Sequence, residues 1–123
     1  MKKLLKIVVS CIFLIHCGHL AAQVTYLGEG KVIKILTDAD FYGGCMAYVA
    51  FDSADTGFVT SGCDRFVSFG CDGGFISKSA ATSNFQSAQL ALLTGAEINV
   101  FADPSRTYNG NYCLVTRVDV AAQ

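Results

Sequence analysis

Apolar residues along the chain fall into short runs, each bounded by glycine, aspartate or serine. These runs predict β-strands at residues 30–36, 45–51, 65–69, 97–101 and 112–120. The run at 45–51 is almost continuously apolar, which is typical of a strand buried on one face and partly covered on the other. Turn residues dominate 52–62, so we expect a connection there in which Phe58 and Val59 extend a hairpin. The segment Asp103-Pro104-Ser105-Arg106 is expected to turn the chain.

The period of the pattern changes near residue 79. Apolar positions then recur at spacings of four, three and four, which places them on one stripe of a helix; they are Ala81, Phe85, Ala88 and Leu92. We expect this helix at about residues 79–94. Ser79 or Ser77 is the expected N-cap, and Gly95 stands where a left-handed residue ends many helices.

The predicted order is strand, strand, strand, helix, strand, strand, which indicates a mainly β domain of the α+β kind. A five-stranded OB-type barrel uses this order, with its helix between the third and fourth strands and covering one end. We therefore expect one OB-like domain at residues 23–123, stapled by disulfides. A short α+β sandwich with an open sheet is the alternative.

Residues 1–22 have the pattern of a secretory signal peptide. Three lysines within the first six residues accompany an apolar stretch from Leu4 to Ile15, and Leu20-Ala21-Ala22 offers small residues for cleavage. The stretch is too short for a stable membrane-spanning helix. We therefore expect a secreted or periplasmic protein that has no membrane attachment after cleavage.

Removal of residues 1–22 takes away both histidines and leaves six basic against ten acidic residues, a net charge of −4. Nucleic acid is bound chiefly by clustered cations, so we do not expect it as a partner. Nearly all the aspartates lie beside glycine or serine in predicted turns, where they bond their own backbone. We therefore expect no enzymatic activity, and a carboxylate-dependent hydrolase is the least favoured interpretation.

Four cysteines remain after cleavage, and no two are closer than eight positions, which disfavours a metal site; no cofactor is expected either. Cys63 and Cys71 flank a predicted strand and would lie roughly 26 Å apart, too far for a disulfide. A hairpin of the second and third strands brings Cys45 towards Cys71. Parallel third and fifth strands bring Cys63 and Cys113 to the same end of a barrel. We predict these two bridges.

Aromatic residues give the best indication of a binding site. Loop tyrosines stand beside glycine or amide side chains, a mixture that suits the hydroxyl groups of a carbohydrate; the candidates are Tyr42, Tyr108, Asn109 and Asn111. The alternative is structural. Tyr48 and Tyr112 would then pack in the sheet, and Asn109-Gly110 would be a tight turn.

Several segments share a pattern with other exported proteins: Cys71-Asp72-Gly73, Ser77-Lys78, Phe85–Ala91, Val100–Asp103, Asn109–Cys113 and Arg117-Val118-Asp119. In these the chain resembles a group of short secreted proteins of unknown function in Gram-negative bacteria, a likeness that brings no activity with it. More distantly, it is similar to the cell-binding B subunit of subtilase-type cytotoxins, an OB-fold protein whose pentamers bind sialylated glycans. That second likeness lies in strand order and in a cysteine pair, here Cys45 and Cys71. No sugar-binding residue is carried over from it.

Together these observations predict an exported, non-enzymatic binding module whose ligand is a glycan or a protein. The alternative is a small periplasmic protein that interacts with or inhibits another protein through exposed apolar strand surface. The resemblance to a pentameric subunit also raises the expectation of a homo-oligomer.

Overall fold

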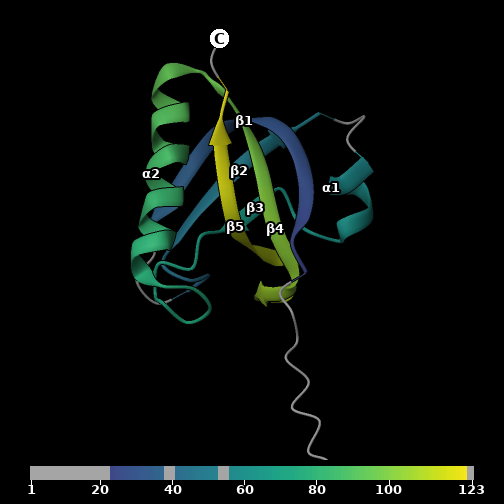
Figure 1. Ribbon diagram of the computed structural model, residues 1–123, viewed down its shortest axis with the longest axis vertical. Helices are drawn as coiled ribbons and strands as arrows, with labels where there is room; N and C mark the ends of the chain where they lie inside the picture. The colour runs from purple at the N-terminus through teal and green to yellow at the C-terminus, as the bar shows by residue number, and fades with distance from the viewer. Residues whose placement is uncertain (1–22, 38–40, 53–55, 122–123) are drawn as a thin grey trace, which may run out of the picture.

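The computed structural model describes residues 23–37, 41–52 and 56–121, which form five strands and two helices (Figure 1). The expected signal peptide at residues 1–22 lies outside the described residues. In chain order the elements are β1 (Thr25–Thr37), β2 (Cys45–Phe51), α1 (Thr56–Ser61), β3 (Phe66–Ser68), α2 (Lys78–Thr94), β4 (Glu97–Tyr108) and β5 (Tyr112–Val120).

The five strands close into a barrel in the order β1-β2-β3-β5-β4, so the alternative of an open sheet was wrong. Neighbouring strands are antiparallel except β3 and β5, which are parallel. The register of β1 shifts between Val32 and Lys34 against β2, and between Tyr26 and Gly28 against β4. Such irregularities bend a strand, and the bends let β1 pair with both neighbours and close the barrel.

The core fills the interior of the barrel with alternate residues of its strands. In β2 the inward side chains are Ala47, Val49 and Phe51, each no more than 4 % exposed. Ile98 and Val100 of β4 are equally buried. Because one face of β2 points into this core and the other is partly covered, the whole strand is apolar.

Helix α2 packs against β1 and β5 and runs alongside β5 in Figure 1. The ring of Phe85 reaches the core, where its centroid lies 5.3 Å from that of Phe69. Ser77 caps the helix, since its Oγ accepts a hydrogen bond from the N–H of Ala80 at 3.2 Å. Gly95 ends the helix in the left-handed conformation with φ 72°. The predicted helix is thus present, with its first residue at Lys78.

Two local predictions were wrong. The segment after β2 does not extend a hairpin but forms the short helix α1, in which the ring of Phe58 stacks on Phe51 with centroids 4.8 Å apart. The chain also does not reverse at Asp103. Strand β4 continues to Tyr108, and its register against β5 jumps between Asp103 and Thr107, so the expected turn is a bulge within a strand.

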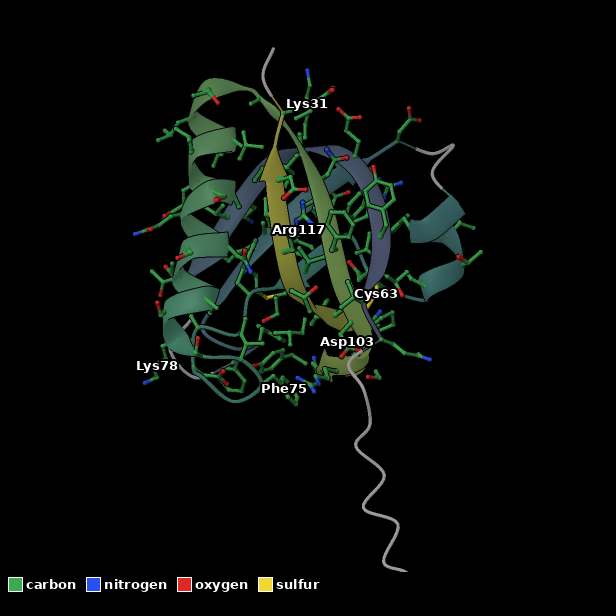
Figure 2. All side chains as sticks on the ribbon, viewed as in Figure 1. Lys31, Cys63, Phe75, Lys78, Asp103 and Arg117 are labelled. Atoms are coloured by element: carbon green, nitrogen blue, oxygen red, sulfur yellow. A yellow bond between two sulfur atoms is a disulfide. The ribbon has the colours of Figure 1, made fainter. Side chains whose placement is uncertain are left out.

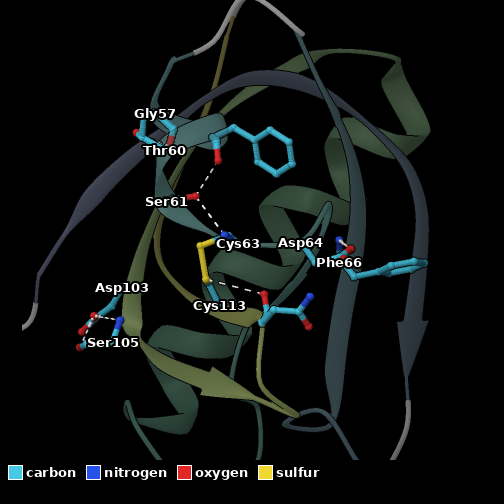
Figure 3. The surroundings of a disulfide bond; sticks show 11 residues. Gly57, Thr60, Ser61, Cys63, Asp64, Phe66, Asp103, Ser105 and Cys113 are labelled. Carbon is cyan, nitrogen blue, oxygen red and sulfur yellow. Dashed lines mark hydrogen bonds between the residues drawn. A yellow bond between two sulfur atoms is a disulfide. The ribbon is translucent and has the colours of Figure 1, made fainter.

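Two disulfides fasten the barrel, and they join the pairs that the strand order favoured. Cys45 is bonded to Cys71 and Cys63 to Cys113, with Cα atoms 5.7 and 5.6 Å apart. Figure 3 shows the second bridge beside Ser61, whose Oγ accepts from the N–H of Cys63 at 3.1 Å. Disulfides persist in oxidising compartments, so they indicate a setting outside the cytoplasm. Within the described ranges, no helix has the length and hydropathy needed to cross a membrane.

Candidate functional site

Strands β2 and β3 carry aromatic side chains on the outer surface of the barrel. Tyr48 lies directly opposite Phe66 in the β2–β3 pair, and their ring centroids are 4.9 Å apart in an edge-to-face arrangement. Both side chains are half-buried and alternate with inward residues such as Val49 and Val67. These two rings therefore lie on the surface of the barrel and are not part of its core.

Neighbouring segments extend this pair into a continuous row. The centroid of Tyr112, the first residue of β5, lies 6.3 Å from that of Phe66 and 5.2 Å from that of Tyr42. Phe41 follows at 6.1 Å from Tyr42 and is 64 % exposed. We call these five residues the aromatic row: Phe41, Tyr42, Tyr112, Phe66 and Tyr48.

A pocket of about 120 Å³ lies against the aromatic row, lined by Leu36, Tyr42, Met46, Phe66 and Tyr112. Leu36 and Met46 are partners in the β1–β2 register and form its aliphatic wall. Of these five residues, Tyr42 and Tyr112 are the ones whose side chains carry a hydroxyl. In the part of the chain that the structure describes, neither hydroxyl takes part in a hydrogen bond.

Tyr42 is held in place by its backbone. It adopts φ 56°, and Gly43 and Gly44 after it have φ 80° and 83°, so the chain makes a tight left-handed bend before β2. The carbonyl oxygen of Tyr42 accepts a hydrogen bond from Oγ of the buried Ser68. The carbonyl of Gly43 accepts from the N–H of Asp72 at 3.1 Å. The loop that presents Tyr42 is therefore pre-organised.

Tyr108, a predicted site residue, does not line this pocket. Its ring lies so close to Gly43 that a Cβ on this glycine would stand 2.7 Å from Cζ of Tyr108. Its hydroxyl donates a hydrogen bond to Oδ1 of Asp72 at 2.8 Å, and its ring contacts Phe75, seen at the lower end of the barrel in Figure 2. Burial, together with the bond to Asp72, raises the pKa of Tyr108 above its ordinary value. Through these contacts Tyr108 supports the loop that presents Tyr42.

Asn109 and Asn111, the other predicted site residues, lie in the exposed β4–β5 hairpin loop next to Tyr112. Asn109 has φ 49° and Gly110 has φ 97°, so the loop is a tight turn of left-handed residues. The carbonyl of Asn111 accepts from the N–H of Asp64 at 2.9 Å. The two amides border the aromatic row but do not line its pocket.

A second hollow, of about 350 Å³, lies elsewhere on the barrel, over β1 and its neighbours; its lining includes Glu29, Lys31, Asp52 and Glu97. These four side chains are exposed, and Ile33 and Ala50 also line the hollow, so charged and apolar groups both border it. Across the described ranges, no group of three or more histidine, cysteine, aspartate or glutamate side chains is arranged to hold a metal ion.

The sequence interpretation missed Tyr48 and Phe66 as candidate residues. The signal was available, because Met46 and Tyr48 alternate with the core residues of the second predicted strand, and Phe66 occupies the corresponding position of the third. Period-two alternation puts these side chains on the outside of a barrel, where large apolar groups are not needed for packing. Only the pairing of the two strands brings them together.

Comparisons with protein-family models, with curated proteins and with solved structures find no match to this chain. The site is therefore interpreted from its own geometry. It consists of a row of partly exposed rings, a small apolar pocket beside them, and a hairpin loop with two exposed amide side chains at one end.

Proposed function

We propose that this protein is an exported, non-enzymatic glycan-binding module built on an OB-like barrel. The observation that carries the proposal is the aromatic row with its pocket. Rings that are half-exposed and braced by one another offer flat apolar surface at little entropic cost, and their hydroxyls add polar contacts. A ligand that is apolar on its ring faces and polar at its edges, as a sugar is, fits such a surface.

The location of the row supports both parts of the proposal. OB-type barrels bind oligosaccharides and oligonucleotides on the outer face of strands two and three and on the loops that join strands one to two and four to five. Here Tyr48 and Phe66 belong to β2 and β3. Tyr42 belongs to the β1–β2 connection, and Tyr112 follows the β4–β5 loop. The row thus coincides with the surface that such barrels use for binding.

Charge favours a glycan over an oligonucleotide. Single-stranded nucleic acid is held by a groove rich in cations as well as by stacking. Residues 23–123 carry a net charge of −4. Beside the aromatic row, Lys34 of β1 is paired in register with Tyr48, and one lysine is a weak footprint for a phosphate backbone.

Export is supported by the pattern of residues 1–22 and by the two disulfides. Both bridges lie in the barrel, and Cys45–Cys71 adjoins the loop that presents Tyr42. An oxidised domain of this kind is suited to the periplasm or the exterior of the cell, where glycans are abundant.

A protein ligand is the second candidate, and one observation favours it. Phe41 is 64 % exposed and its ring contacts that of Tyr42 in the pocket lining, and aromatic residues are enriched in protein interfaces. In that case the pocket would take an apolar side chain of the partner. The protein would then act as a small interaction or inhibitor module.

A glycan array probed with purified residues 23–123 tests the proposal. Tyr112→Ala and Phe66→Ala should each weaken binding roughly tenfold or more, because each removes a central ring of the row. Tyr26→Ala is the matched control, since Tyr26 is an exposed tyrosine of the same barrel that contacts Phe101 and not the row. Variants that bind like the parent, or an array with no bound glycan, would contradict the proposal. Capture of one protein partner that is lost in the same variants would favour the second candidate.

A further inference from the structure

We infer that the bound glycan carries an acetamido group, and that the methyl of this group occupies the pocket between Leu36, Met46 and the aromatic row. The inference rests on the proposed function and names the class of sugar. It follows from the size of the pocket, from the chemistry of its lining and from its position beside the rings.

The size of the pocket selects a substituent and not a whole sugar ring. Pockets that enclose a complete small ligand measure about 300–1,000 Å³. This one measures about 120 Å³, which is a few water molecules' worth of space. A pyranose ring would therefore rest outside, on the aromatic row, while one group projecting from it enters the pocket.

The lining selects an apolar group. Leu36 and Met46 supply aliphatic side chains, and the remaining walls are rings of the row. A hydroxyl or an ammonium placed against the side chains of Leu36 and Met46 would give up hydration without a matching partner there. A methyl group gains free energy by leaving water for the same surroundings. Among the substituents that sugars commonly carry, the N-acetyl group presents such a methyl.

The polar part of an acetamido group also finds suitable partners. Its carbonyl accepts and its N–H donates hydrogen bonds, and a tyrosine hydroxyl can do either. Tyr42 and Tyr112 both line the pocket, and within the described residues their hydroxyls are engaged with no other group. A group that is apolar at its tip and polar at its stem therefore matches a pocket with apolar walls and two phenols.

Isothermal titration with matched sugars tests the inference. Chitotriose and cellotriose share ring stereochemistry and linkage and differ at C2, where the first carries acetamido groups and the second hydroxyls. N-acetylgalactosamine and galactose form a second matched pair. In each pair the acetylated sugar should bind roughly tenfold more tightly, the usual discrimination by a pocket that fits one small apolar group.

Two substitutions at Leu36 locate the preference in the pocket. Leu36→Phe should fill the pocket and erase the difference within each pair. Leu36→Ala should widen the pocket and reduce the difference several-fold, and it remains informative if the larger side chain prevents folding. Ile33→Phe is the matched control, because Ile33 lies on the same strand, is 57 % exposed and does not line the pocket. It should leave the preference unchanged.

The outcomes separate this inference from the proposed function. Equal affinity within both pairs would overturn the inference while glycan binding stands. A preference for acetylated sugars that survives both Leu36→Phe and Leu36→Ala would overturn it as well. If no sugar on the array or in the calorimeter binds, the proposed function fails together with the inference.

Discussion

Tyr108 donates a hydrogen bond from its hydroxyl to Oδ1 of Asp72 across 2.8 Å, and this bond ties the end of β4 to the loop after Cys71. The Cys45–Cys71 bridge fastens the same loop to the start of β2. The carbonyl oxygen of Gly43, in the loop that presents Tyr42, accepts a hydrogen bond from the N–H of Asp72 in that loop after Cys71. One disulfide and two hydrogen bonds thus tie the loop after Cys71 to β2, to β4 and to the segment that presents Tyr42.

The raised pKa of Tyr108 predicts a loss of stability at alkaline pH. The folded protein binds the phenolic proton more tightly than the unfolded chain, whose tyrosines titrate near 10. The stabilising contribution is therefore complete below about pH 10 and is lost as pH rises towards the folded pKa. Urea midpoints followed by circular dichroism at pH 8 to 11 should fall more steeply for the parent than for Tyr108→Phe. Identical pH dependence in the two proteins would contradict this account.

Adding one methyl group at Gly57 is expected to destabilise the fold severely. A Cβ at this position would overlap the backbone carbonyl oxygen of Tyr26, so α1 and β1 would have to separate. Gly57→Ala should reduce the free energy of unfolding by roughly 2–4 kcal/mol, the range of serious overpacking. Gly74→Ala is the control, because the nearest atoms to its Cβ would be those of Asp72 at 3.4 Å, an ordinary contact. Equal stabilities of the two variants, measured by urea unfolding, would exclude the close packing of α1.

The two disulfides should contribute differently to stability. Cys63–Cys113 spans 50 residues and Cys45–Cys71 spans 26, so the chain-entropy model gives about 4 and about 3.5 kcal/mol. Replacing Cys63 and Cys113 by alanine should therefore lower the melting temperature more than replacing the other pair.

Loss of Cys45–Cys71 should instead weaken ligand binding, because that bridge supports the Tyr42 loop. A thiol titration that finds four free sulfhydryls in the purified protein would refute both statements.

Asp103 is fully buried and depends on its neighbours in the β4 bulge. Its Oδ1 accepts hydrogen bonds from the N–H and Oγ of Ser105, drawn in Figure 3, and its Oδ2 lies 3.4 Å from Nε of Arg106. Arg106→Gln should destabilise the fold by about 1–3 kcal/mol, because it leaves a buried carboxylate without its counter-charge. In a double-mutant cycle with Asp103→Asn, the double variant should lose less stability than the sum of the two single losses, by at least about 0.5 kcal/mol. Full additivity would show that the pair does not interact.

Hydrophobic periodicity predicted helix α2 and the five strands, because burial on one face sets the pattern of apolar residues in these elements. The stripe through Phe85 and the run at 45–51 are both consequences of burial on one face, which the sequence displays directly. It failed at α1, where the local residues favour turns and the helix is held by Phe58 stacking on Phe51. Periodicity also failed at Pro104. Proline has no N–H to donate to a neighbouring strand and usually marks a turn. Here Pro104 lies in a bulge of β4, outside the β4–β5 pairing.

The candidate site was predicted less well, for a physical reason. Loop composition identified Tyr42, which lines the pocket. Tyr108 has the same sequence context, yet the close approach of Gly43 and the bond to Asp72 give it a structural part. Tyr48 and Phe66 are 18 positions apart in the chain and meet only through the register of β2 and β3. Pairings of this kind depend on strand register, which residue patterns alone leave open.

The most direct test of the account is a titration of ¹⁵N-labelled residues 23–123 with the best glycan from the array, followed by NMR. We predict shift changes at the amides of Tyr42, Tyr48, Phe66 and Tyr112, with little change at Glu29 and Lys31 beside the larger hollow. Changes centred on Glu29 and Lys31, with the amides of the aromatic row unmoved, would contradict it.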